Sequence, residues 1–188
     1  MALALFCVSL NVSAQNATYQ AGQNLTTYPT LNDFVYSRTS GSVITLTANV
    51  SISSAIWLIS NDISITSDAG GPYTIKWTGS ANGNHFYTQS TSVLSLESII
   101  IDGGKIGGGI YSYDADDTLI IGNNTTIKDC KTGNRHGGGI CALGNLILVG
   151  KVTITGNETT RYNGGGIYKS ACRNDLDLCN ISFDNKEM

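Results

Sequence analysis

Short runs of alternating apolar and polar residues recur along the chain in pairs, with a tight bend between the two runs of each pair. An alternation with a period of two predicts a strand that buries one of its faces. The residues between the apolar positions are mostly Ser, Thr, Lys and Asp, which suit a solvent-facing side. The pairs are Ile44-x-Leu46 with Val50-x-Ile52, Leu94-x-Leu96 with Ile99-x-Ile101, Leu146-x-Leu148 with Val152-x-Ile154, and Leu176-x-Leu178 with Ile181-x-Phe183.

A glycine triplet followed by Ile occurs three times in the second half of the chain. Its copies begin 30 and then 27 residues apart (137 − 107 and 164 − 137). A phrase that recurs at such an interval is typical of repeat proteins, in which one unit stacks on the next. We expect a strand after each triplet and the glycines at sharp corners, because Gly tolerates positive φ and close backbone approach. The predicted turn glycines are Gly107, Gly108, Gly109, Gly137, Gly138, Gly139, Gly164, Gly165 and Gly166.

From residue 42 onward one strand pattern follows another, and no helical pattern interrupts them. The predicted strands in the first half cover residues 43–47, 55–59, 63–66, 73–77, 85–88, 93–96 and 99–101. Turn clusters rich in Gly, Asn and Asp separate them. Parallel strands without crossover helices must be joined by coiling, and parallel connections are nearly always right-handed. The sequence therefore predicts an all-β fold, a right-handed parallel β-helix over residues 42–188.

Residues 15–41 are predicted to lead into this solenoid and to close its first turn. The polar residues before Thr30 are expected to be extended or disordered. Thr30 with Asp33 three positions later is typical of a helix start. A short N-terminal capping helix is expected here, because an open solenoid end exposes apolar core and unpaired backbone. Its apolar face would comprise Leu31, Phe34 and Val35.

The two ends of the chain lead to further predictions. Residues 1–14 hold a short apolar run and a small-residue cleavage site at Val12-Ser13-Ala14, which predicts the remnant of a signal peptide and a secreted or cell-surface location. No later segment reaches the roughly 20 apolar residues of a membrane span. At the other end, the paired strands over residues 176–183 are complete and no cap follows. We therefore expect a solenoid truncated at its C-terminus, which self-associates through its open last turn.

Composition limits the classes of partner that we expect, but it does not decide whether the cysteines form disulfides. Charged residues make up 13% of the chain, the net charge is −3, and no basic patch is evident, so nucleic acid is not an expected partner. The four cysteines after Cys7 permit disulfides, which exported proteins carry. The alternative is that small apolar cysteines fill interior positions. The residues in question are Cys130, Cys141, Cys172 and Cys179.

These repeats resemble those of polymorphic outer-membrane proteins and related β-helix adhesins, over residues 30–188. In that family Gly-Gly-Ala-(Ile/Leu) alternates with Phe-x-x-Asn. Here a third Gly replaces the Ala, Ile154-x-x-Asn157 carries Ile for Phe, and the stretch from Ile127 to Cys130 lacks the Asn. The resemblance implies a pectate-lyase-like fold and a non-enzymatic protein that acts in adhesion or as a structural stalk. A host or cell-surface protein or a glycan is then the expected partner.

Pectate lyases and other polysaccharide-cleaving enzymes share that fold, so a lyase or glycosidase is the alternative function. Such activity needs clustered carboxylates, for calcium or for acid–base chemistry, beside Lys or Arg. Three acids near the first glycine triplet form a candidate carbohydrate or calcium site, with a solvated turn as the competing interpretation. An enzyme would be favoured if these acids lay beside Lys128 or Arg135. The acids are Asp114, Asp116 and Asp117. No other cofactor is predicted.

Tyr111 and Tyr168 follow two of the glycine triplets at the same phase, and Cys141 takes that place in the triplet between them. Side chains at one phase of stacked turns lie in a row, so a tyrosine row is expected. Such a row is a candidate binding surface for glycan or protein, although Tyr also simply favours strands. His85 and His136 have no Ser or Cys at a suggestive spacing, so no nucleophile–base pair is expected.

Overall fold

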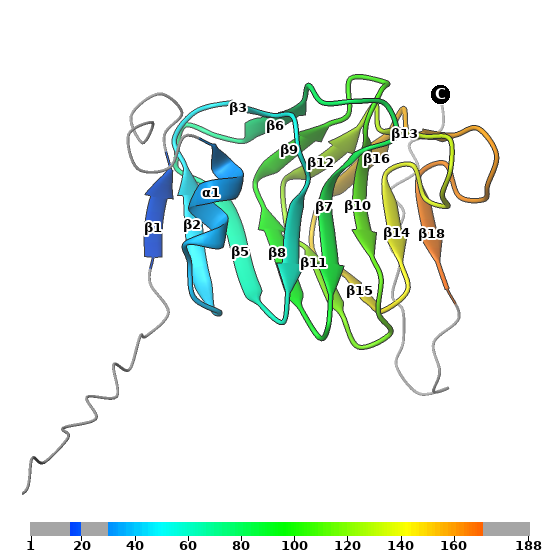
Figure 1. Cartoon of the computed structure of the whole chain (residues 1–188). Coiled ribbons are helices and arrows are strands. Elements are labelled where there is room, and N and C mark those ends of the chain that lie inside the picture. The colour runs from blue at the N-terminus through cyan, green and yellow to red at the C-terminus, as the bar shows by residue number, and fades with distance from the viewer. Residues whose placement is uncertain (1–15, 20–29, 171–188) are drawn as a thin grey trace, which may run out of the picture.

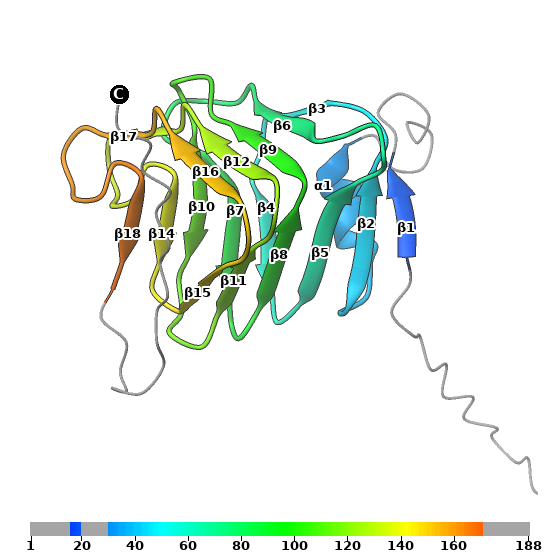
Figure 2. The ribbon, with the colours of Figure 1, turned by 180° about the vertical axis from the view of Figure 1, so that it is seen from behind.

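A computed structural model describes residues 16–19 and 30–170, and about half of these lie in parallel strands wound into a solenoid (Figure 1). The chain rises along one face, crosses the top and descends the opposite face, advancing to the next turn each time (Figures 1 and 2). This sense of winding is right-handed. The predicted right-handed parallel β-helix is confirmed.

Three long parallel sheets, here called A, B and C, form the sides of the solenoid. Sheet A contains β1 (Asn16–Tyr19), β2 (Ser42–Leu46), β5 (Asp62–Ser67), β8 (Val93–Glu97), β11 (Thr118–Ile121) and β15 (Asn145–Leu148). Sheet B contains β3 (Val50–Ile52), β6 (Tyr73–Trp77), β9 (Ile99–Asp102), β12 (Thr125–Lys128) and β16 (Val152–Thr155). Sheet C contains β4 (Ile56–Ile59), β7 (Asn84–Gln89), β10 (Gly108–Ser112), β14 (Ile140–Ala142) and β18 (Ile167–Lys169). Between sheets B and C, β13 (Lys131–Thr132) pairs with β17 (Glu158–Thr159).

The core is a set of columns of in-register apolar side chains, because each inward residue pairs with an inward residue of the next turn. Burying one such Ile or Leu side chain contributes about 1.5–3 kcal/mol. Sheet A contributes Ile44, Ile65, Leu96, Ile121 and Leu148. Sheet B contributes Val50, Ile75, Ile101, Ile127 and Ile154. Sheet C contributes Ile56, Phe86, Ile110, Ile140 and Ile167. The seven strands predicted in the first half match the observed strands to within one residue at either end.

The predicted capping helix is present as α1 (Leu31–Tyr36). The Thr30 side chain accepts a hydrogen bond from the backbone N–H of Asp33, and the Asp33 carboxylate accepts from the N–H of Thr30, so the N-terminus carries a capping box. The apolar face of the helix joins the core through Leu31, Phe34 and Val35.

The helix also satisfies the exposed edge of sheet C at β4. Asn32 Nδ2 donates to the carbonyl of Ala55 at 2.8 Å, and the backbone N–H of Trp57 donates to the Tyr36 hydroxyl at 3.0 Å. An unpaired strand edge invites association with other chains. Helix α1 therefore closes the first turn both by covering core and by pairing backbone groups.

The polar residues before the helix contain a strand that the sequence pattern did not predict. Asn16–Tyr19 forms β1, which pairs in parallel with β2 and adds one strand to sheet A. Tyr19 is buried, and its ring centroid lies 5.2 Å from that of Phe34. Four residues with one large buried side chain are too few to show a period of two.

Several predictions fall outside the described residues. These are the signal-peptide remnant over 1–14, the last strand pair over 176–183, and the states of Cys172 and Cys179. Self-association through the last turn accordingly stays a prediction. Within the described residues, no helix combines the length and apolar character needed to cross a membrane.

The second and third glycine triplets sit at the corners before β14 and β18, whereas Gly108 and Gly109 of the first triplet lie inside β10, so the expected corner is not formed there. Glycine is required in the second and third triplets for two different reasons. Gly137 and Gly164 have φ values of 65° and 73°, a region that disfavours side chains. Gly138 does not have positive φ, so the expectation of that conformation is not met there. Instead, a Cβ at Gly138 would collide with the carbonyl oxygens of Glu158 and Gly165 on the next turn. Close approach of neighbouring backbones is the requirement at that position.

Asn157, which ends the Ile-x-x-Asn phrase, links two turns through its side chain. Its Oδ1 accepts from the backbone N–H of Cys130 at 2.9 Å, and its Nδ2 donates to the carbonyl of Ile127 at 2.9 Å. The amide replaces ladder bonds at a corner where the strand pairing is interrupted. The motif thus has a structural role in this chain.

Candidate functional site

The outward side of sheet C carries a row of side chains, one from each stacked strand, and all but one of them are aromatic. Because strand residues alternate between faces, the residue after each inward Ile or Phe points outward. The row consists of Trp57, Tyr87, Tyr111, Cys141 and Tyr168, each in register with the next. The expected alignment of Tyr111, Cys141 and Tyr168 is therefore present, and the row extends by two aromatic residues toward the N-terminus. Its role in binding stays a prediction.

Four rings cluster at the N-terminal end of this row. The Trp57 and Tyr87 centroids are 4.2 Å apart, and Tyr113 stacks on Trp57 at 5.7 Å with an interplanar angle of 16°. Tyr113 follows β10 and lies 4.6 Å from Tyr111, centroid to centroid. Aromatic pairs in such tilted and offset arrangements contribute about 0.5–1.5 kcal/mol beyond the area that they bury. The cluster is therefore a rigid platform.

Arg135 lies over this platform, from the loop between β13 and β14. Its guanidinium carbon is 5.0, 4.9 and 5.7 Å from the ring centroids of Tyr87, Tyr111 and Tyr113. Nη1 also donates to the Tyr113 hydroxyl at 3.0 Å, and Thr159 Oγ1 fixes the loop by donating to the Arg135 carbonyl at 2.9 Å. A guanidinium over aromatic rings is held by cation–π attraction while its outer N–H groups stay available.

A second group of rings lies at the C-terminal end. The His136 ring stacks on Tyr168 at 4.2 Å and meets the edge of Tyr162 at 5.0 Å. The N–H of Asn163 donates to His136 Nδ1 at 3.1 Å, which places the ring proton of the neutral form on Nε2. The two groups together are called the aromatic face below. It comprises Trp57, Tyr87, Tyr111, Tyr113, Arg135, His136, Tyr162 and Tyr168.

The aromatic face combines exposed rings with retained hydroxyl groups. Trp57 and Tyr162 are 37% and 47% exposed, whereas Tyr87 is only 6% exposed and supports the others from below. Burial raises the pKa of the Tyr87 and Tyr111 phenols, so both remain hydrogen-bond donors at neutral pH. The face can therefore stack apolar rings and hydrogen-bond polar groups beside them.

Cys141 interrupts the aromatic row and offers no nucleophile. Its side chain is 1% exposed, and burial raises the pKa of its thiol to about 11. Cys130 is also buried, with a thiol pKa raised to about 12 by burial. Both are free thiols. Cys130 belongs to the apolar core, which confirms the interpretation as a small interior residue, whereas Cys141 is buried on the outward side of sheet C beside Tyr111.

The structure places the three acids proposed as a site in different environments. Asp117 is fully buried, and its carboxylate accepts hydrogen bonds from Thr88 Oγ1 at 2.8 Å and from the N–H of Ser92 at 3.0 Å. Asp114 accepts from the N–H of Ser90 at 2.7 Å, while Asp116 is exposed. Asp117 and Asp114 thus hold the turn that joins sheet C to sheet A.

Neither proposed cation partner forms an ion pair with these acids. Lys128 pairs with Asp102 on sheet B, Nζ to Oδ2 at 3.3 Å, and Arg135 lies over the tyrosines. Across residues 16–19 and 30–170, no three or more His, Cys, Asp or Glu side chains gather in a way that could hold a metal ion. The acids are not brought together as a calcium or acid–base constellation.

His85 is buried where sheets B and C meet. Its Nδ1 lies 2.8 Å from the carbonyl oxygen of Gly108, and its Nε2 lies 3.1 Å from that of Ile75. Burial lowers the pKa of His85 to about 4, against the opposing effect of these carbonyls and of Asp102. The neutral ring carries one N–H and so donates to only one of these two carbonyls. Buried between sheets B and C, His85 has no free face for a substrate.

Sequence reasoning singled out only Tyr111 and Tyr168 of the aromatic face. Trp57 and Tyr87 follow Ile56 and Phe86 in the same apolar–aromatic order, a signal that would have identified them. Arg135 was noted only as a possible partner of the acids, because nothing local shows that its loop folds over sheet C. Comparisons of the chain with family profiles, with curated proteins and with solved structures return no match.

Proposed function

We propose that this chain is a secreted or cell-surface β-helix protein that acts in adhesion, as a non-enzymatic binding stalk. The observation that carries the proposal is the aromatic face, in which stacked turns present aligned rings together with Arg135. Aromatic residues and Arg are the side chains that most often anchor protein recognition surfaces. The parallel solenoid and its repeated turns agree with the adhesin resemblance of the sequence.

A glycan or a surface protein is the partner that this chemistry suits. The apolar face of a sugar ring packs on exposed rings such as Trp57, while tyrosine hydroxyls and the Arg135 guanidinium hydrogen-bond its hydroxyl groups. Because the rings are already ordered by their mutual contacts, little conformational entropy is lost on binding. The face is thus suited to repeated weak contacts along an extended partner.

The test uses an array of neutral and acidic oligosaccharides probed with the full chain and with the double variant Trp57→Ala, Tyr168→Ala. We expect the double variant to lose binding by about tenfold or more, because Trp and Tyr are enriched among the hot-spot residues that contribute about 2 kcal/mol or more. The matched control is Ile147→Ala, a side chain 45% exposed on the outer side of sheet A. Equal binding by the wild type and the double variant would refute the proposal.

The polysaccharide-cleaving alternative makes a different prediction. Asp116 is the one exposed acid of the three, so it is the remaining carboxylate with access to substrate. Release of reducing ends or unsaturated products from a polysaccharide by the purified chain, abolished in Asp116→Ala, would favour the enzyme over the adhesin.

A further inference from the structure

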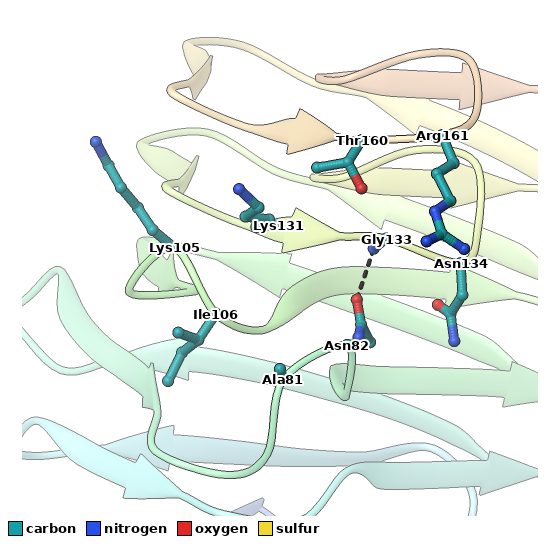
Figure 3. Close-up of a pocket in the computed structure, with 9 residues that line it drawn as sticks. All are labelled: Ala81, Asn82, Lys105, Ile106, Lys131, Gly133, Asn134, Thr160 and Arg161. Atoms are coloured by element: carbon teal, nitrogen blue, oxygen red, sulfur yellow. Dashed lines mark hydrogen bonds between the residues drawn. The ribbon is translucent and has the colours of Figure 1, made fainter.

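The corner between sheets B and C carries an open hollow of about 400 Å³ (Figure 3). Its lining comes from four successive turns of the solenoid, at residues 81–82, 105–106, 131–134 and 160–161. A volume of this order lies within the range of small-ligand sites. The hollow is distinct from the aromatic face, although the two share the loops after β13 and β17.

Three lining side chains are cations, one from each of three consecutive turns: Lys105, Lys131 and Arg161. Lys131 and Arg161 come from adjacent turns, whereas the Lys105 side chain extends away from Arg161 at the other end of the hollow (Figure 3). Lys131 pairs with Glu158, Nζ to Oε1 at 2.9 Å. Neither Lys105 nor Arg161 has a carboxylate within 4.0 Å in the described part of the chain. The hollow therefore keeps two cations without an ion-pair partner there.

The polar lining is held in place by hydrogen bonds that cross from turn to turn. Asn82 Oδ1 accepts from the N–H of Gly133 at 2.6 Å, and the N–H of Asn82 donates to the carbonyl of Ile106 at 3.0 Å. This hydrogen bond uses the Oδ1 of Asn82 and leaves its Nδ2 group available as a donor. The Arg161 side chain extends along the hollow toward Asn134 (Figure 3). Amide and hydroxyl groups thus lie beside the cations on a fixed backbone.

We propose that this hollow binds a tetrahedral oxyanion, a sulfate or phosphate ester carried by a sugar. Guanidinium and ammonium groups recognise such anions through charge-assisted hydrogen bonds, and several donors are needed to satisfy three free oxygens. The lining supplies Arg161 as the charge beside Asn134, with Asn82 and Thr160 as neutral donors (Figure 3). The site goes beyond the aromatic face, and its binding is measurable whether or not that face binds a glycan.

The experiment titrates the full 188-residue chain with glucose 6-sulfate, glucose 6-phosphate and glucose, followed by amide NMR. We expect the amides of Gly133 and Thr160 to shift with both esters and not with glucose. The ester that binds more tightly identifies the source of the anion. Arg161→Gln should weaken the binding about tenfold, since a hydrogen bond to a charged group contributes at least that factor.

Lys151→Gln is the matched control, because Lys151 is exposed at the corner between sheets A and B. The substitution removes one positive charge, as Arg161→Gln does. It should leave the affinity unchanged. Lys105→Gln removes the exposed charge at the far end of the hollow and should weaken the binding less than Arg161→Gln does. The proposal is overturned if neither ester shifts the lining amides at millimolar concentration. It is equally overturned if Lys151→Gln weakens binding as much as Arg161→Gln, since the effect is then one of net charge.

Discussion

The outer sides of sheets B and C are built by the same in-register stacking, yet they carry opposite kinds of chemistry. On sheet B, Lys76, Asp102 and Lys128 occupy matching positions of three successive strands. Their charges alternate from turn to turn, and Lys128 Nζ lies 3.3 Å from Asp102 Oδ2. On sheet C the matching positions repeat aromatic residues until Cys141.

The difference follows from what each kind of side chain gains from a neighbour of its own kind. In-register strands place equivalent residues about 4.8 Å apart. Like charges at matching positions destabilise a sheet, so a charged row must alternate and becomes electrically balanced. Aromatic rings attract one another at this spacing, so an aromatic row can continue. A solenoid therefore accumulates a contact surface most readily from aromatic residues.

The largest effect should come from removing the buried support of sheet C. Asp117→Ala leaves Thr88 Oγ1 and the N–H of Ser92 without their acceptor, directly after the aromatic strands. Hydrogen bonds to a charged acceptor are worth about 1.5–3 kcal/mol each, so the free energy of unfolding should fall by about 4 kcal/mol. Urea denaturation measures this change.

Asp116→Ala is the matched control, one residue away and exposed. Its free energy of unfolding should change by no more than about 0.5 kcal/mol, as for most surface substitutions. Similar losses in the two variants would mean that Asp117 does not hold the turn, and that the aromatic platform is supported in another way.

The next largest effect is a dependence of the free energy of unfolding on pH, caused by His85 where sheets B and C meet. Burial lowers the pKa of His85 to about 4, below its ordinary value of 6.5. As pH falls from 6.5 to 4, the unfolded chain takes up the proton before the folded chain does. The free energy of unfolding should therefore decrease across that window by about 3 kcal/mol and change no further below it on this account. Thermal or urea unfolding between pH 7 and pH 4 measures the slope.

Carboxylates also titrate in this window, so the control must isolate the imidazole. His85→Gln should flatten the slope, whereas His136→Gln, which removes the other histidine of the chain, should leave it in place. If the slope survives in His85→Gln, the buried ring is not the group that titrates.

The smallest effect tests charge alternation on sheet B. Asp102→Lys would align three ammonium groups, and we expect a loss of about 1 kcal/mol that high salt largely restores. Asp102→Asn is the control, because its Oδ1 can still accept from the N–H of Gly104, as Asp102 does at 2.9 Å. A loss equal in both variants, and insensitive to salt, would show that alternation of charge is not what this face requires.

The strands and the capping helix could be predicted from the sequence because their signals are local. Alternation located the seven strands predicted in the first half to within one residue, and Thr30 with Asp33 fixed the start of the helix. Gly138 shows the limit of this reasoning. Glycine is required there because the carbonyls of Glu158 and Gly165 leave no room for a Cβ, and only the stacking of turns brings these carbonyls near.

The candidate site was predicted only in part for the same reason. The alignment of Tyr111 with Tyr168 follows from the repeat, but Arg135 reaches sheet C through a loop whose path has no local pattern. Likewise, the burial of Asp117 depends on donors 25 and 29 residues earlier in the chain, at Ser92 and Thr88. A cluster of acids in sequence looks like a solvated turn until those donors are placed.

Constant register also fixes the spacing between equivalent positions of the aromatic face. Each turn advances the row by the same step of about 4.8 Å. If the aromatic face binds an extended partner as we propose, that partner should match it best when its own groups recur at multiples of this step. Insertion or deletion of a whole turn lengthens or shortens the row by one position and leaves the spacing of the remaining positions unchanged. The reach of the surface can thereby change independently of its chemistry.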